Sequence, residues 1–188
     1  EVRFAMAQCY FGLERYDEAE VLFRQSAASH PDKKRRWAAN IHLGKIDETR
    51  FDYEKAISKL KDVYVQSDVK DVQDEARQLI NRIIDENLPK VALVRLLRKY
   101  RSGFPVDQIL LKLISIYREE RNIEQLQAAL SGFLHLFPEH PHRSKIEAGL
   151  KRVKENVGRK TRVGVVLPLT GEMALVGQQV LQGVQLAV

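Results

Sequence analysis

Apolar residues recur at helical spacing over most of this 188-residue chain, and this pattern restricts the fold more than any other feature. Between residues 1 and 157 they return every three to four positions, in stretches separated by short turns. No stretch there alternates apolar with polar residues as a half-buried strand does. We therefore expect a mostly α-helical right-handed array over residues 1–157, made of nine helices with no strand of five or more residues.

The predicted helices form pairs that carry the same marker residues. Tyr16 precedes Ala19 by three positions, and Tyr53 precedes Ala56 in the same way 37 residues later. Leu126 holds the equivalent place a further 70 residues on, which leaves room for one less regular pair between them. Four pairs are the most economical interpretation, and a helical bundle with no repeat relationship is the alternative.

The first 31 residues resemble a tetratricopeptide repeat, a helix pair that stacks into solenoids. The residues at the family's packing positions are Tyr10, Tyr16, Ala19, Phe23 and Pro31 in the first copy. In the later copies they are Gly44, Tyr53, Ala56, Tyr117 and Pro138. Small residues let the two helices of a pair approach closely, so we expect Ala19 and Ala56 to be buried where they meet.

A further helix is predicted after the four pairs. Pro141 stands at its start, Ile146 and Leu150 lie on one side, and Gly158 is placed to end it. Stacked repeats need a terminal helix with a polar outer side, so we expect this helix to cap the array. A linker over residues 158–161 then follows.

The pattern changes in residues 162–188. Val163–Leu167 is a short apolar, β-branched run typical of a buried strand in a parallel sheet, and Pro168 ends it. A helix is predicted from about Glu172, and the loop before it would face a cleft at the carboxyl end of the strand. The candidate ligand-cleft residues are Leu169, Thr170, Gly171, Glu172 and Val176.

This segment resembles the start of a type I periplasmic binding protein domain. The resemblance is carried by Pro168, Thr170, Gly171, Gly177 and Gly183. It implies the first β-strand and α-helix of a truncated α/β domain, with a small-molecule site in the complete domain. Val176 stands where amino-acid receptors of this family commonly have an aromatic residue, which argues against a free amino-acid ligand.

The composition excludes several classes of function. The single cysteine, Cys9, allows no internal disulfide, and we expect it to be a small buried residue. His140 and His142 lie beside Glu139 in the only tight group of metal-binding residue types, and we expect neither a metal nor another cofactor. No catalytic motif is present, so we expect no enzyme activity. The net charge is +6, but the sequence has no interleaved aromatic residues of the kind that stack on bases, so we expect no nucleic-acid partner.

Equivalent positions on the first helices of the pairs predict a peptide groove. They are occupied by Gln8, Lys45, Arg82 and Ser115, with Arg118 one turn further on. Three cations would suit an acidic or carboxylate-ended peptide, and an ordinary solvated surface is the alternative. A basic run at Lys33–Arg36 is interpreted as a solvated turn, with an acidic partner or an anionic membrane surface as the alternative.

A tetratricopeptide-like array followed directly by a type I periplasmic-binding-protein domain resembles penicillin-binding protein activator lipoproteins of the LpoA/LppC type. The resemblance implies a non-catalytic regulator in the periplasm of a Gram-negative bacterium, held at the outer membrane by a lipid anchor outside this segment. Its partner would be a peptidoglycan synthase. A solute-binding receptor of a branched-chain amino-acid transporter type, with an added repeat domain, is one alternative. A general repeat scaffold is another.

Overall fold

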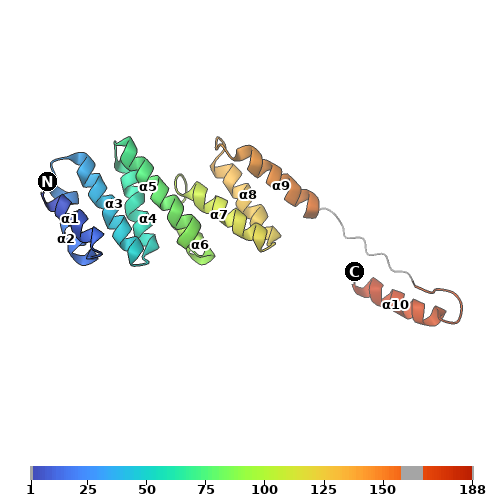
Figure 1. The fold of residues 1–188 in the computed structure, drawn as a ribbon. Helices are drawn as coiled ribbons and strands as arrows, with labels where there is room; N and C mark the ends of the chain where they lie inside the picture. The colour runs from blue at the N-terminus through green and yellow to red at the C-terminus, as the bar shows by residue number, and fades with distance from the viewer. Residues whose placement is uncertain (1, 158–166, 188) are drawn as a thin grey trace. The chain divides into compact units, whose positions relative to one another are not determined.

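The computed structural model describes residues 2–157 and 167–187, and its regular structure there is entirely helical (Figure 1). The α-helices are α1 (Val2–Gly12), α2 (Tyr16–Ser29), α3 (Lys33–Thr49), α4 (Tyr53–Gln66), α5 (Lys70–Arg82), α6 (Lys90–Lys99), α7 (Val106–Glu119), α8 (Ile123–Leu136), α9 (Arg143–Val157) and α10 (Ala174–Ala187). A short π-helix, η1 (Ile83–Asn87), follows α5 directly. The nine α-helices predicted before residue 158 are therefore present, and the described residues contain no strand.

Contacts divide the chain into two units, residues 1–153 and 154–188. The predicted linker at 158–161 and four residues of the predicted strand, 163–166, lie outside the described residues. Leu167, the last residue of that predicted strand, belongs to no regular element.

Three of the turns inside the pairs have the same geometry. Their central residues, with φ of 58°, 61° and 55°, are Glu14, Phe51 and Arg121. The next N–H in each case donates 2.9 Å to the carbonyl five residues earlier, as in a Schellman helix end. These turns are spaced by 37 and 70 residues, the same spacing as the marker residues. The repeat predicted from side chains is thus also present in the backbone.

The third pair is one helical turn shorter than the others. The second helices of the pairs are followed by C-cap residues His30, Ser67, Tyr100 and Phe137, which are 37, 33 and 37 residues apart. Helices α2, α4 and α8 each have 14 residues, whereas α6 has 10. The π-helix η1 stands where the other pairs have a Schellman turn, and Pro89 lies directly before α6.

The core of the first unit consists of two clusters that meet in α3. One contains Phe23 and Leu43, and the other begins with Ile41 and extends to Ile146 on α9. Ala19 and Ala56 are fully buried, one in each cluster, as predicted. Because α3 contributes side chains to both clusters, it connects the packing of the first pair to that of the later pairs.

Close packing of the second pair depends on Gly44. A Cβ atom at this position would lie 2.9 Å from Leu60 Cγ on α4, too close for a carbon–carbon contact. The absence of a side chain therefore lets α3 and α4 approach each other. At the end of the unit, α9 buries Ile146 against the second cluster, with Leu150 packed beside it, as a capping helix does.

Ion pairs join successive repeats at the surface. Lys33 Nζ lies 2.8 Å from Asp68 Oδ2, and Lys34 Nζ lies 3.2 Å from Asp71 Oδ2. The hydrogen bond from Lys33 lowers the pKa of Asp68. Exposed pairs of this kind contribute little to stability. The first half of the basic run at Lys33–Arg36 thus contacts the next repeat.

Cys9, which the sequence predicted to be buried, is exposed. It lies roughly 200° around α1 from the fully buried Ala7, so it points away from the rest of the array. Val91, an apolar residue of the third pair, is also exposed, at 73%. Its helix, α6, begins only one residue earlier and has no preceding turn to cover it.

In the second unit, α10 begins at Ala174, two residues later than predicted. The Ala174 N–H donates 3.1 Å to the Gly171 carbonyl, and Gly171 has a φ of 81° that suits glycine. A Cβ atom at Gly177 would lie only 2.1 Å from the Pro168 carbonyl oxygen. Gly177 therefore allows the helix to pack on the preceding segment, whereas Gly183 faces open space.

Candidate interaction surfaces

Two residues of the predicted peptide groove come together between α3 and α5. Lys45 and Arg82 line a hollow of about 640 Å³, and Tyr53 also borders it. Both cations already have partners: Lys45 Nζ lies 2.8 Å from Glu75 Oε1, and Arg82 Nη2 lies 2.7 Å from Glu48 Oε2. The array itself neutralises them, so this hollow does not offer the cationic groove that the sequence predicted.

The other predicted groove residues lie elsewhere on the array. Gln8 is exposed on α1, and the Ser115 hydroxyl donates 3.2 Å to Glu119 Oε1. Arg118 is exposed and forms no ion pair within the described part of the chain. None of the three borders the hollow that holds Lys45 and Arg82.

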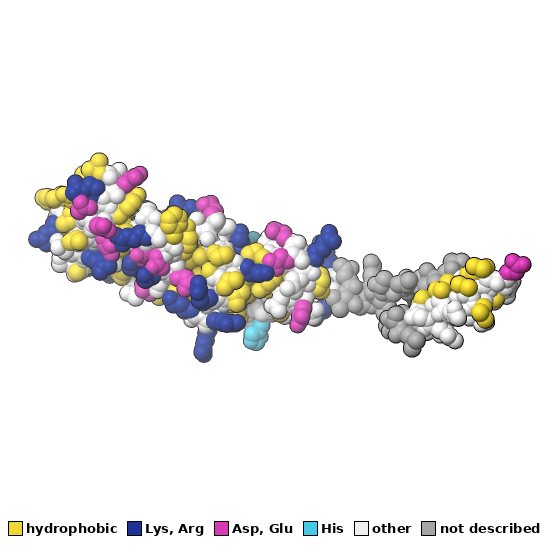
Figure 2. All heavy atoms as spheres, turned by 90° about the horizontal axis from the view of Figure 1, so that it is seen from below, with side chains coloured by type: hydrophobic (Ala, Val, Ile, Leu, Met, Phe, Trp, Pro, Cys, Tyr) yellow, Lys and Arg dark blue, Asp and Glu magenta, His cyan; other side chains and the backbone are white. Residues whose placement is uncertain are grey.

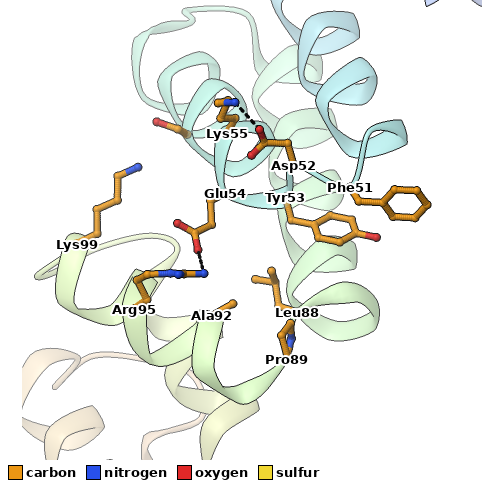
Figure 3. A pocket seen from close by; sticks show the side chains of 11 residues that line it. Phe51, Asp52, Tyr53, Glu54, Lys55, Leu88, Pro89, Ala92, Arg95 and Lys99 are labelled. Atoms are coloured by element: carbon orange, nitrogen blue, oxygen red, sulfur yellow. Dashed lines mark hydrogen bonds and ion pairs between the residues drawn. The ribbon is translucent and has the colours of Figure 1, made fainter.

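A second hollow, of about 630 Å³, lies where the missing turn of α6 leaves space beside the start of α4 (Figure 3). Leu88, Pro89 and Ala92 form its apolar side. Four of its charged side chains pair with one another, since Arg95 Nη2 lies 2.5 Å from Glu54 Oε1 and Lys55 bonds Asp52 (Figure 3). That hydrogen bond lowers the pKa of Asp52 and raises the pKa of Lys55.

A largely apolar surface lies between α6, α7 and α8, and sequence reasoning missed it. It consists of two adjoining hollows, of about 490 and 340 Å³, that share Val94, Arg98 and Tyr117. We call it the apolar groove. Its apolar or small lining residues are Val91, Val94, Leu97, Leu110, Leu113, Tyr117, Ala128, Ala129, Gly132 and Leu136.

The groove has a buried floor and uncovered edges. Leu113 on α7 is 1% exposed, whereas Val91 on α6 is 73% and Leu136 on α8 is 38% exposed. Figure 2 shows hydrophobic side chains in the middle of the array next to a cluster of Lys and Arg. Contiguous exposed apolar surface of this kind marks interaction sites in soluble proteins. The sequence signal was the adjacent small residues Ala128 and Ala129, together with Gly132 inside α8.

The predicted ligand-cleft residues lie around an exposed turn of the second unit. Leu169 and Val176 are each 48% exposed, and Thr170, Gly171 and Glu172 are also exposed. The turn leads into α10 as predicted, but a cleft requires a sheet edge, and the described residues contain no sheet. The ligand site therefore stays a prediction for the complete domain.

The histidine pair packs in the turn between α8 and α9. The His140 ring contacts Phe133 at a centroid distance of 5.0 Å, and His140 Nδ1 accepts a 3.1 Å hydrogen bond from the His142 N–H. His140 Nε2 lies 3.6 Å from Asp107 Oδ2. No group of three or more potential metal ligands occurs among residues 2–157 and 167–187.

No helix in the described ranges is both long and apolar enough to cross a membrane. Comparison of the chain with protein-family models, with curated proteins and with solved structures gives no match. The function must therefore be inferred from the surfaces described above.

Proposed function

We propose that this protein is a non-catalytic interaction protein whose helical pairs bind a segment of a partner protein. The observation that carries this proposal is the apolar groove, whose edges at Val91 and Leu136 are uncovered in the array. Stacked helix pairs present extended surfaces of this kind, and protein ligands use them. The charged groups in the other two hollows pair mainly with one another, as expected of structural contacts.

A narrower proposal concerns the partner. We propose that it is a penicillin-binding protein that synthesises peptidoglycan, and that this protein activates it in the periplasm. The order of a repeat array followed by the Pro168–Gly183 segment supports this proposal. So does the close contact of Gly177 with Pro168, because it explains the first of the two spaced glycines of a type I periplasmic-binding-protein domain.

The test uses the purified chain and the purified extracytoplasmic region of a bifunctional penicillin-binding protein. Biolayer interferometry is expected to give a dissociation constant in the micromolar range, and glycan polymerisation is expected to accelerate severalfold. Selection from a random peptide library displayed on phage tests the broader proposal independently. If peptides are selected but the synthase does not bind, the protein is a general scaffold. If no peptide is selected and the synthase does not bind, both proposals are overturned.

Calorimetry against the common amino acids separates a regulator from a solute receptor. We expect no heat of binding, because the turn at Leu169–Glu172 is exposed and Val176 stands where amino-acid receptors of this family commonly have an aromatic residue. A micromolar amino-acid ligand would favour the receptor and contradict the narrower proposal.

A further inference from the structure

We infer that the apolar groove binds an acidic amphipathic helix of a partner protein. This inference rests on the proposed function and specifies the chemistry of the segment that is bound. The groove belongs to the second helices of the third and fourth pairs, α6 and α8, with α7 as its floor. None of the predicted groove residues lines it, although Ser115 and Arg118 belong to the same helix α7.

The shape of the groove fits a helix. Helix α8 has 14 residues and so extends for about 21 Å, which is about four turns of a bound helix running beside it. Ala128 and Gly132 are one turn apart on α8, and a Cβ atom added at Gly132 would meet nothing within 4 Å. These small residues allow another helix to come close, while Val91 and Leu136 supply apolar contacts toward the two ends.

The charges of the groove select an acidic ligand. Arg98 and Arg101 line it, are exposed, and form no ion pair in the described ranges. Two cations of α6 are already neutralised, because Lys90 pairs with Glu120 at 2.6 Å and Arg95 with Glu54 at 2.5 Å.

No aspartate or glutamate lines either hollow of the groove. A helix with leucines on one side and glutamates along the edge would cover the apolar walls and pair with both guanidinium groups. Helix α10 of this chain does not have that chemistry, since its sequence contains no acidic residue.

The probe is a fluorescein-labelled peptide of about 18 residues, with leucines at helical spacing and glutamates beside them. A matched peptide carries lysine at every glutamate position. Fluorescence anisotropy with the full chain is expected to give micromolar binding for the glutamate peptide and at least roughly tenfold weaker binding for the lysine peptide. Higher salt should weaken binding of the glutamate peptide because its ion pairs are exposed.

Two variants locate the binding site. A Cβ atom at Gly132 would meet nothing within 4 Å, so Gly132→Leu is expected to occupy the groove. It should weaken binding at least roughly tenfold while the melting temperature stays equal or rises. Arg98→Glu with Arg101→Glu is expected to weaken binding of the glutamate peptide and strengthen binding of the lysine peptide.

The charge control is Lys145→Glu with Arg152→Glu. Both residues are exposed on α9 and have no ion pair within the described ranges. This control replaces two cations by two glutamates, so it changes the net charge as much as Arg98→Glu with Arg101→Glu does. We expect binding within roughly twofold of the unaltered chain, because bulk charge is screened at physiological salt.

Equal binding of the two peptides, or equal effects of the groove and control variants, would overturn the inference. A dimer in analytical ultracentrifugation that Gly132→Leu dissociates would overturn it as well, because a second copy would then occupy the groove. If phage-selected peptides bind the Gly132→Leu variant as tightly as the unaltered chain, the inference fails while the proposed function stands. If no peptide binds at all, both fail.

Discussion

The first two helix pairs, α1–α4, and the next two, α5–α8, follow the same plan but differ in completeness. In the first half both second helices have 14 residues and both internal turns are of the Schellman type. In the second half, α6 has 10 residues and a π-helix replaces one such turn. The surface differs as well, since only the second half has the apolar groove, whose Arg98 and Arg101 form no ion pair within residues 2–157 and 167–187.

This difference shows how a solenoid obtains a binding surface. Regular repeats cover one another, because each helix meets equivalent side chains from its neighbours. Removing one turn takes away the side chains that would have covered the start of α4, which leaves the hollow around Pro89. The same shortening leaves Val91 in the first turn of α6, exposed at the edge of the apolar groove.

The largest expected effect concerns the buried alanines. Ala56→Leu should lower the free energy of unfolding by roughly 1–3 kcal/mol through overpacking, because Ala56 is fully buried. Ala128→Leu, at an exposed position of α8 in the other half, should change it by less than about 0.5 kcal/mol. Urea unfolding measures both, and similar losses for the two variants would remove the contrast between the halves.

The pH dependence of the first half should be the next largest effect. His42 stacks on Phe23 at 4.5 Å, and burial, followed by the nearby Lys45, lowers its pKa to about 4. Between pH 6.5, the ordinary pKa of histidine, and about pH 4, the unfolded chain therefore binds a proton at this residue that the folded chain does not. The contribution of neutral His42 to stability should be fully present above pH 6.5. The free energy of unfolding should fall by roughly 2 kcal/mol as the pH drops to about 4.5.

Urea unfolding at the two pH values measures this effect, and His42→Phe is the control. That variant lacks the titrating group and should lose distinctly less stability on acidification. If both proteins lose the same amount, another group causes the dependence.

Two glycine substitutions should have opposite signs in the two halves. Gly44→Ala should destabilise the protein by roughly 1–2 kcal/mol, because the new Cβ atom meets Leu60 at 2.9 Å. Gly132→Ala should stabilise it by roughly 0.5–1 kcal/mol, since the helix gains propensity in open space. Thermal unfolding followed by circular dichroism would show both shifts, and the same sign for both would contradict the packing difference.

The smallest expected effect tests what the halves have in common. Glu14→Gly and Arg121→Gly place glycine at positive φ in equivalent turns, one in each half. Each should raise the free energy of unfolding by about 0.5 kcal/mol, because glycine adopts this conformation without steric cost. A gain in only one half would show that the two turns are not energetically equivalent.

The sequence by itself determined the helices and their pairing. Helical periodicity and turn signals act within one segment, so the bounds of the pairs followed from them without knowledge of neighbours. The recurrence of Ala19 and Ala56 determined which helices stack, and both residues are buried. The shortening of the third pair was also visible in the sequence, in the 70-residue spacing between Ala56 and Leu126. That spacing was interpreted only as room for another pair.

Only the tertiary structure decided which surfaces stay uncovered. Lys45 and Arg82 are neutralised by Glu75 and Glu48, which lie 30 and 34 residues away in the chain and on neighbouring helices. The apolar groove likewise needs α6, α7 and α8 at particular distances, and no local pattern encodes a distance between separate helices. Exposure depends on what packs against a side chain, whereas periodicity records only which side chains of one helix share a face.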